Sequence, residues 1–365
     1  MGGYVAVAYA AQYPAEALEW AQRVDRLRLS GSGGLFAQAL AGVAEQEPDM
    51  ALQLALDTRG PTQEWAVSSV INAIAGQDPQ LAMRYLEKMP AGQNRSQVAT
   101  QIALRWAQSD PGAAIAWLGS LGDRNARQNG FSQIGAELAQ RDIETAVRLT
   151  DQIPADSRAM WIANVANGYA QYDVEAAVQW MKKSQSAPGY PQALPSFLWT
   201  LAQQDPDAAF SFATQAGDDD RERDQAIASV VQAAAQQTPA TAAKWIAHIS
   251  DENIRRAAVT QVVGQWAAYD LSGARKWASS LDTGLLRDAA LTSLIAYSSS
   301  SLEEVEPLIM QIQSGDARME AVMQAALRLS SEDPEAARDL LRRHPLDPPH
   351  QQQLDTFRQR AGKGW

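Results

Sequence analysis

Small and large apolar residues recur at fixed spacings along the whole chain, and this recurrence predicts its secondary structure. The clearest copy runs from Asp110 to Leu121, and degenerate copies of it recur every 31 to 34 residues. A period this regular indicates a stack of similar units instead of one closed core. With Pro111 as the reference, the equivalent positions are Pro14, Pro48, Pro79, Pro111, Ile143, Val174, Pro206, Pro239, Leu271, Leu302 and Pro334.

Each copy opens with a signal for the start of a helix. The residue before the reference is predicted to cap the helix, because its side-chain oxygen accepts a hydrogen bond from a free backbone N–H of the first turn. Proline at the reference position suits the first helical residue, where no N–H is needed. The predicted caps are Asp78, Asp110, Asp142, Asp173, Asp205, Thr238, Asp270, Ser301 and Asp333.

Two apolar columns follow each helix start. Three residues after the reference stands alanine in every copy except the one with Val305, and six residues after it stands Trp, Tyr, Phe or Leu. Small and large side chains at these spacings interdigitate between neighbouring helices. We therefore predict an all-α fold, an α-solenoid of about eleven αα-hairpins, each with a first helix of about ten residues and a second of about fifteen.

The pattern predicts a single solenoid domain over residues 1–365. Residues 1–13 read as an incomplete first repeat, 14–345 as the repeats and 346–365 as a C-terminal capping helix. A solenoid end needs a polar outer face, and the predicted helix from His350 to Arg360 has only Leu354 and Phe357 to bury. The stretch Leu29–Gly34 is expected to be a flexible turn.

The first residues read as the second helix of a hairpin whose first half is missing. Tyr4–Ala11 is apolar and is not a polar cap. This favours a natural upstream segment, such as an export signal or a membrane anchor. It also raises the hypothesis that two copies dimerise through this uncapped end.

Composition narrows the partners. The formal charge of −11 and the pI near 4.9 disfavour nucleic acid and anionic membranes as partners, since both need a basic surface. No apolar run reaches the roughly 20 residues of a membrane span. The absence of cysteine excludes disulfides, thiol catalysis and cysteine-bound metals. It favours an exported, periplasmic protein, with the cytoplasm as the alternative.

The first candidate binding row lies four residues after each reference. It is apolar through eight copies and becomes charged at Arg275, Glu306 and Arg338. One interpretation is packing between helices; the other is a groove for a partner helix or an extended peptide. The apolar members are Leu18, Leu52, Met83, Ile115, Val147, Val178, Phe210 and Ala243.

The second candidate row is a column of arginines in the first turn of the second helix. A cation there opposes the helix dipole. It therefore needs a compensating partner, either a capping Asp of an adjacent unit or the carbonyls that close the preceding helix. The alternative is a strip that recognises an acidic ligand. The column is Arg95, Arg127, Arg158, Tyr190, Arg223, Arg255, Arg287 and Arg318, interrupted only by Tyr190.

Two starts of second helices carry a family resemblance. Asp251–Val259 and Asp316–Val322 resemble the second helix of HEAT-type repeats, in which Asp and Arg form a ladder. The hairpins also resemble tetratricopeptide arrays, although the period is 32 instead of 34 and the glycine-tyrosine signature is missing. The resemblance implies a scaffold or binding role and transfers no particular partner.

Motifs for catalysis are missing from the sequence. The three histidines, His248, His344 and His350, lack metal-ligand spacing. There is no phosphate-binding glycine loop or nucleophile elbow. We therefore predict a non-catalytic scaffold for a protein or peptide partner, without cofactor or metal. The alternatives are a cell-wall or glycan binder, suggested by eleven tryptophans, and a superhelical accessory domain of a peptidoglycan-acting enzyme.

Overall fold

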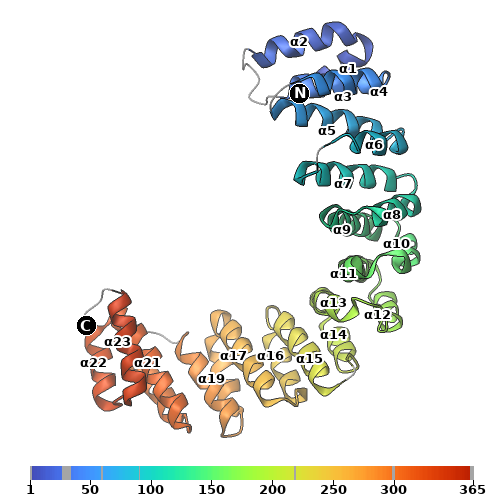
Figure 1. The fold of residues 1–365 in the computed structure, drawn as a ribbon. Coiled ribbons are helices and arrows are strands. Elements are labelled where there is room, and N and C mark those ends of the chain that lie inside the picture. Colours follow the sequence, from blue (N-terminus) through green and yellow to red (C-terminus); the bar gives the residue numbers. More distant parts are fainter. Residues whose placement is uncertain are drawn as a thin grey trace. The chain divides into compact units, whose positions relative to one another are not determined.

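The protein is all-α. A computed structural model describes residues 2–26, 34–58, 61–89, 91–217, 219–297 and 301–361. The chain is 82% helical, and no strand occurs among these residues, as Figure 1 shows. The all-α prediction is confirmed. Most of the predicted flexible turn, Leu29–Gly33, lies outside the described residues.

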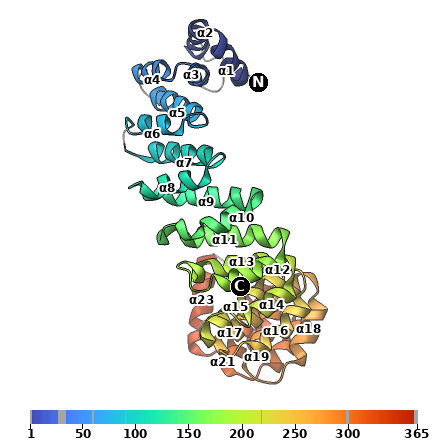
Figure 2. The same ribbon diagram turned by 90° about the vertical axis from the view of Figure 1, so that its right-hand side faces the viewer.

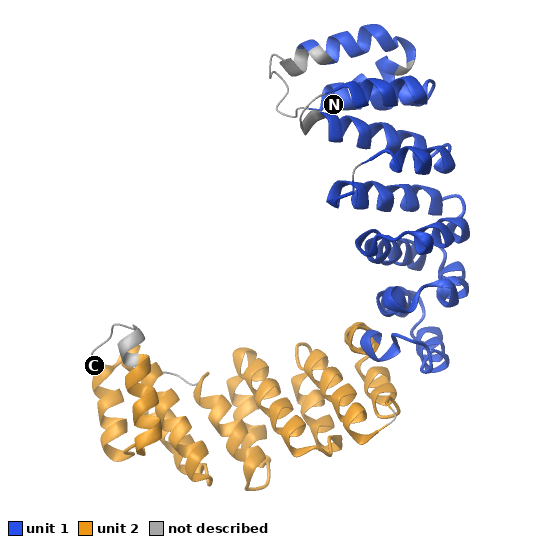
Figure 3. Cartoon of the chain, in the orientation of Figure 1, with its two compact units in different colours: residues 1–193 blue, residues 194–365 orange. Residues whose placement is uncertain are grey.

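The chain divides into two compact units (Figure 3). Unit 1 comprises residues 1–193 and unit 2 residues 194–365. The boundary falls inside the helix α13 (Tyr190–Gln204). None of the helices in the described ranges is both long and apolar enough to span a membrane.

Unit 1 consists of alternating first and second helices of hairpins. The second helices from α1 to α11 pack on one another in chain order, and the first helices from α2 to α10 each contact the second helices before and after them. In Figure 1 the first helices α4 to α12 lie to the right of the second helices. The first helices are α2 (Pro14–Arg26), α4 (Pro48–Asp57), α6 (Pro79–Leu86), α8 (Pro111–Ser120), α10 (Ile143–Leu149) and α12 (Val174–Lys183). The second helices are α1 (Gly2–Gln12), α3 (Leu35–Ala44), α5 (Pro61–Ala75), α7 (Gln93–Ala107), α9 (Arg124–Arg141) and α11 (Ala155–Tyr172).

Unit 2 has a similar pattern of contacts, except that its last first helix, α22, packs mainly on α21 and α20. Its second helices pack in chain order from α15 to α23, and the turned view in Figure 2 shows α17, α19 and α21 with the first helices α16 and α18 beside them. The first helices are α14 (Pro206–Ala213), α16 (Pro239–Trp245), α18 (Leu271–Ser280), α20 (Leu302–Gln311) and α22 (Pro334–Arg343). The second helices are α15 (Asp220–Ala234), α17 (Glu252–Tyr269), α19 (Leu285–Ile295), α21 (Gly315–Glu332) and α23 (Pro348–Ala361).

The aspartate caps form as predicted. At all seven aspartates, Oδ1 accepts a hydrogen bond of 2.9 to 3.1 Å from the backbone N–H three residues on. The prediction is wrong for Thr238 and Ser301, which stand before their helices without a side-chain cap bond. The Thr238 hydroxyl instead donates to the Ala234 carbonyl of the preceding turn, a local bond that competes with capping.

The alanine column lies in the interior. All ten alanines three residues after the reference are fully buried, and so is Val305. The large column is less uniform: Tyr85, Leu149, Phe212, Trp245, Leu308 and Leu340 are buried, whereas Trp117, Trp180 and Trp277 are half-buried and Trp20 is exposed. The small side chains therefore lie where neighbouring helices approach most closely, while the large ones fill the remaining space and in part reach the surface.

The last helix differs from its prediction in two respects. α23 begins at Pro348 instead of His350, because proline suits the first turn of a helix. Leu354 is buried as expected, but Phe357 is 51% exposed, so the prediction that Phe357 is buried is wrong. α23 packs mainly on α21 and buries one narrow stripe, and Phe357 lies outside it.

Tyr85 gives the first helices of unit 1 a testable pH dependence. Its burial, together with the hydrogen bond that its phenol donates to Asp49, raises the pKa of Tyr85 from 10.0 to about 12. The folded state therefore favours the neutral phenol, so this contribution to stability is full below pH 10 and is lost as the pH rises toward 12. We expect Tyr85→Phe to be less stable at neutral pH and to lose less stability than the parent protein across this range. Urea unfolding at a series of pH values measures both, and equal alkaline losses in the two proteins would contradict the assignment.

Candidate binding surface

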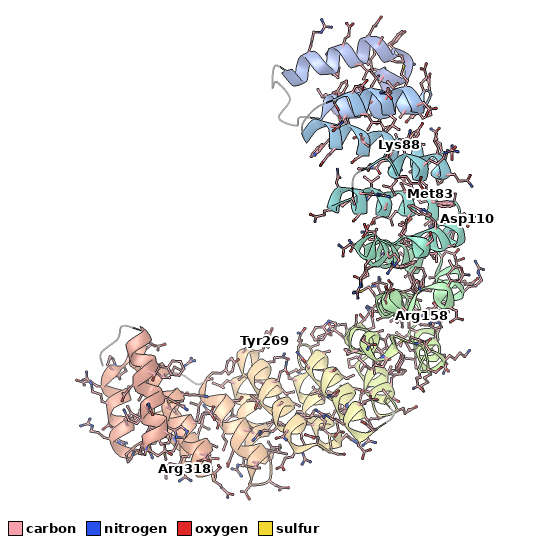
Figure 4. All side chains as sticks on the ribbon, in the orientation of Figure 1. Met83, Lys88, Asp110, Arg158, Tyr269 and Arg318 are labelled. Carbon is pink, nitrogen blue, oxygen red and sulfur yellow. The ribbon has the colours of Figure 1, made fainter. Side chains whose placement is uncertain are left out.

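The predicted apolar row lies mostly against the core. Ile115 is 1% exposed and offers almost no surface to a partner. Met83, labelled in Figure 4, and Val147 are half-buried and pack on the hydrophobic clusters of unit 1. Val178 is half-buried, and so is Phe210, whose ring stacks on Trp245 at 4.7 Å between centroids. These contacts support the packing interpretation, and a partner groove on this row stays a prediction.

The arginine column binds carbonyl groups at the ends of first helices. Arg127 donates to the Leu121 carbonyl at 2.6 Å, and Arg158 donates through Nε to the Ile153 carbonyl at 2.9 Å. Arg95 and Arg318 make the equivalent bonds to Met89 and Ile312. Figure 4 labels Arg158 in unit 1 and Arg318 in unit 2. The predicted pairing with closing carbonyls is confirmed at these four positions, and it explains how a cation is tolerated at a helix start.

The other members of the column differ from one another. Arg223 pairs with Asp220 of its own helix at 2.9 Å, and Arg287 donates to the Gln311 side chain. Arg255 is half-buried, and its Nε has no hydrogen-bond partner within the described residues. Tyr190 is buried where the column is interrupted. Recognition of an acidic ligand by this column stays a prediction.

One arginine also joins neighbouring second helices. Arg127 on α9 forms an ion pair of 2.9 Å with Asp156 on α11. The hydrogen bond from Arg127 holds the pKa of Asp156 below its usual value. Asp156 lies in the first turn of α11 and is not one of the predicted capping aspartates, so this ion pair was not among the partners predicted from the sequence.

Two buried aspartates escaped the sequence analysis. Asp224 and Asp288 are 1% and 2% exposed, and each accepts two backbone N–H groups from the connection that follows the next first helix. Asp224 on α15 thus holds the turn before α17, and Asp288 on α19 holds the turn before α21. The signal in the sequence was the dipeptide Arg-Asp at 223–224 and again at 287–288, where the aspartate follows the arginine column directly.

A hollow of about 710 Å³ opens in unit 1 between α5, the end of α6 and the start of α7. Its apolar residues include Leu56, Val67 and Met89, and the last two are buried. Trp65 stands in its wall with 65% of its surface exposed. Lys88, labelled in Figure 4, follows α6 at its edge. Its polar residues are Gln63, Glu64, Lys88, Gln93, Asn94 and Gln97.

A second hollow of about 410 Å³ continues from the first along the second helices α5, α7 and α9. The two share Asn94 and Gln97. Asn94 also connects α5 to α7, since its Nδ2 lies 3.4 Å from Oε2 of Glu64 and the Ser68 hydroxyl approaches its Oδ1. The lining contains no charged side chain and consists of Ser68, Asn72, Asn94, Gln97, Val98, Thr100, Gln101, Asn129 and Gln133.

Four carboxamides of this surface are exposed and free. Gln97 and Gln101 lie on α7, and Asn129 and Gln133 lie on α9. None of the four makes a side-chain hydrogen bond to another described residue. We call these four residues, Gln97, Gln101, Asn129 and Gln133, the amide row. Each carboxamide offers two N–H donors and one acceptor oxygen. Two adjacent helices therefore present unused donors and acceptors without net charge.

Unit 2 has a larger hollow of different chemistry. It measures about 1080 Å³ and lies over α17, α19, α21 and the start of α23. Its lining includes the charged residues Arg256, Asp316 and Glu320, as well as the buried Asp288 and the phenol of Tyr297. Gln324 donates to Glu320, so part of this polar lining is already paired.

Comparisons with known proteins do not assign the chain to a family. No protein-family model matches the chain, and no curated protein matches it significantly. Within the described ranges, no group of three His, Asp or Glu side chains is placed to hold a metal ion. The geometry of the surface itself is therefore the basis for assigning a function.

Proposed function

We propose that the chain is an α-solenoid of about eleven αα-hairpins and serves as a non-catalytic scaffold that binds a partner protein through an extended peptide segment. In support, neighbouring second helices pack in chain order within each unit, and the first helices lie between them along the chain. A stack of this kind presents the same helix face several times in succession, which suits a long and thin ligand.

The amide row is the observation on which this proposal rests. An extended peptide presents backbone N–H and C=O groups that need partners, and carboxamides supply both. Neighbouring helices lie about 8 to 10 Å apart, and an extended chain advances about 3.3 Å per residue. Each helix would therefore meet about three residues of the peptide.

The lack of charge along the row is also informative. The chain carries a net charge of −11, yet the smaller hollow has no charged residue in its lining. Hydrogen bonding to backbone groups needs no charge, whereas a nucleic acid or an acidic ligand would need cations. The exposed Trp65 keeps glycan binding as the second candidate, because an indole face and carboxamides also suit a neutral sugar. Export to the periplasm stays a prediction from composition.

A peptide-selection experiment tests the proposal. The full chain is presented to a phage-displayed library of random peptides, and the peptides recovered are synthesised and titrated. The double change Gln101→Ala with Gln133→Ala is expected to weaken their binding at least about tenfold, because it removes direct hydrogen bonds on two helices. The matched control is Gln80→Ala with Gln179→Ala, two exposed glutamines on the first helices α6 and α12.

The outcomes separate clearly. Loss of affinity in the first double variant and not in the control supports the amide row as the peptide site. Equal affinity in both variants, or no enrichment of peptides on the parent protein, overturns it.

A further inference from the structure

The hollow of about 710 Å³ in unit 1, called the Trp65 hollow below, has both apolar and polar side chains in its lining. Val67 and Met89 are buried and contribute apolar atoms to the lining, and Leu56 adds a third apolar side chain. Gln97 belongs to the linings of both hollows and is also part of the amide row. A volume of about 710 Å³ falls within the usual range of ligand sites. The hollow therefore has the form of a pocket beside a backbone-binding strip.

The charges at the hollow balance. Glu64 contributes one negative charge and Lys88 one positive charge, and the other lining residues are neutral. The Glu64 carboxylate is also within reach of the Asn94 side chain, which directs part of its hydrogen bonding toward α7. A charged side chain that entered this pocket would lose water and gain no matching net charge. The balance of charge therefore favours an uncharged occupant.

The exposed indole indicates which uncharged group fits. Trp65 is the most exposed tryptophan among those whose exposure the structure describes, and burying its face against an apolar group is favourable. An apolar group in the hollow would also bury apolar surface against Leu56, Val67 and Met89. Sugar hydroxyls placed against these three side chains would find no hydrogen-bond partner there, which is costly, whereas an apolar side chain loses none. The apolar interior thus favours a side chain over a sugar ring.

We propose that this hollow is an anchor pocket for one large, uncharged apolar side chain of the bound peptide, preferably aromatic, which packs on Trp65. The residues on either side of the anchor place their backbone groups along the amide row. The pocket determines which segment binds and in which register, whereas the amide row binds backbone of any sequence. This inference rests on the proposed function and specifies its ligand.

Small probes test the pocket without any selected peptide. The full chain is labelled with fluorotryptophan, and the Trp65 signal is assigned by its disappearance in Trp65→Phe. N-acetyl-phenylalanine methylamide is expected to shift this signal, whereas N-acetyl-aspartate methylamide and the neutral disaccharide cellobiose are not. A shift with cellobiose alone makes the site a glycan site and overturns the anchor pocket, as does no shift with any probe.

Selected peptides provide the second measurement. Trp65→Ala is expected to weaken their binding at least about thirtyfold, as for a buried aromatic contact at the centre of an interface. The control Tyr172→Ala removes another exposed aromatic residue of unit 1 and is expected to change affinity less than about threefold. Peptides that depend on Gln101 and Gln133 but not on Trp65 would overturn the pocket and leave the proposed function intact. Peptides that are indifferent to all three residues would overturn the proposed function.

Discussion

Asp288→Asn is expected to lower the free energy of unfolding by about 2 to 4 kcal/mol, because it leaves a buried N–H group without an acceptor. The Asp288 carboxylate is almost fully buried and uses both oxygens, with Oδ1 accepting from the Gln313 N–H and Oδ2 from the Ser314 N–H. Asparagine keeps one acceptor oxygen and turns an NH₂ group toward the other N–H. The turn before α21 would then be bound less firmly to α19.

Asp224→Asn is the matched control, and its expected cost is under about 1 kcal/mol. At Asp224 a single oxygen, Oδ2, accepts from both Ser250 and Asp251, and Oδ1 has no hydrogen-bond partner in the described structure. The asparagine oxygen can keep both bonds. Urea unfolding gives the two free energies, and hydrogen exchange at Gln313 and Ser314 reports the local opening. Equal losses in the two variants would show that charge, and not the number of acceptor oxygens, determines the cost.

The starts of the first helices were predictable because their determinants are local. A capping Asp and a following proline act within one turn of helix, so the sequence alone predicts Asp78, Asp110 and the other five aspartate caps. Thr238 shows the limit of this reasoning, since its hydroxyl donates to the Ala234 carbonyl and accepts no N–H from the first turn of α16. The alanine column was predictable for a related reason: its helical spacing fixes one face, and alanine occupies it in every copy except at Val305.

The candidate surface was harder to predict because exposure depends on neighbouring helices. Gln101 and Gln133 are ordinary polar residues in the sequence, and only the packing of α7 on α9 places them on one open face. Trp65 was indistinguishable in the sequence from tryptophans of the interior such as Trp161. Glycine carried a further hidden signal: a Cβ atom at Gly168 would lie 2.5 Å from Cβ of Ala139, so α11 approaches α9 closely only because that position is glycine.

Trp161→Ala is expected to cost about 3 to 5 kcal/mol, the largest loss for a single change that we expect in unit 1. Trp161 on α11 is fully buried, and its Nε1 donates to the Ala146 carbonyl at 3.2 Å and to the Thr150 hydroxyl at 3.1 Å. Its ring also lies so close to Gly135 on α9 that a Cβ atom there would come within 2.9 Å of it. Alanine would open a cavity between three helices and remove the bond that holds α10 to α11. Thermal and urea unfolding measure the loss.

Trp161→Phe separates packing from hydrogen bonding at this position. Phenylalanine keeps most of the apolar contact with α9 but lacks the indole N–H. Trp161→Phe is therefore expected to lower the free energy of unfolding by only about 1 to 2 kcal/mol. If this variant were as unstable as Trp161→Ala, the two acceptors on α10 and on the turn after it would outweigh the cavity. If both variants stayed as stable as the parent protein, the contact between α9 and α11 would not depend on Trp161. The small residues Gly168 and Ala139 would then account for the packing of these two helices.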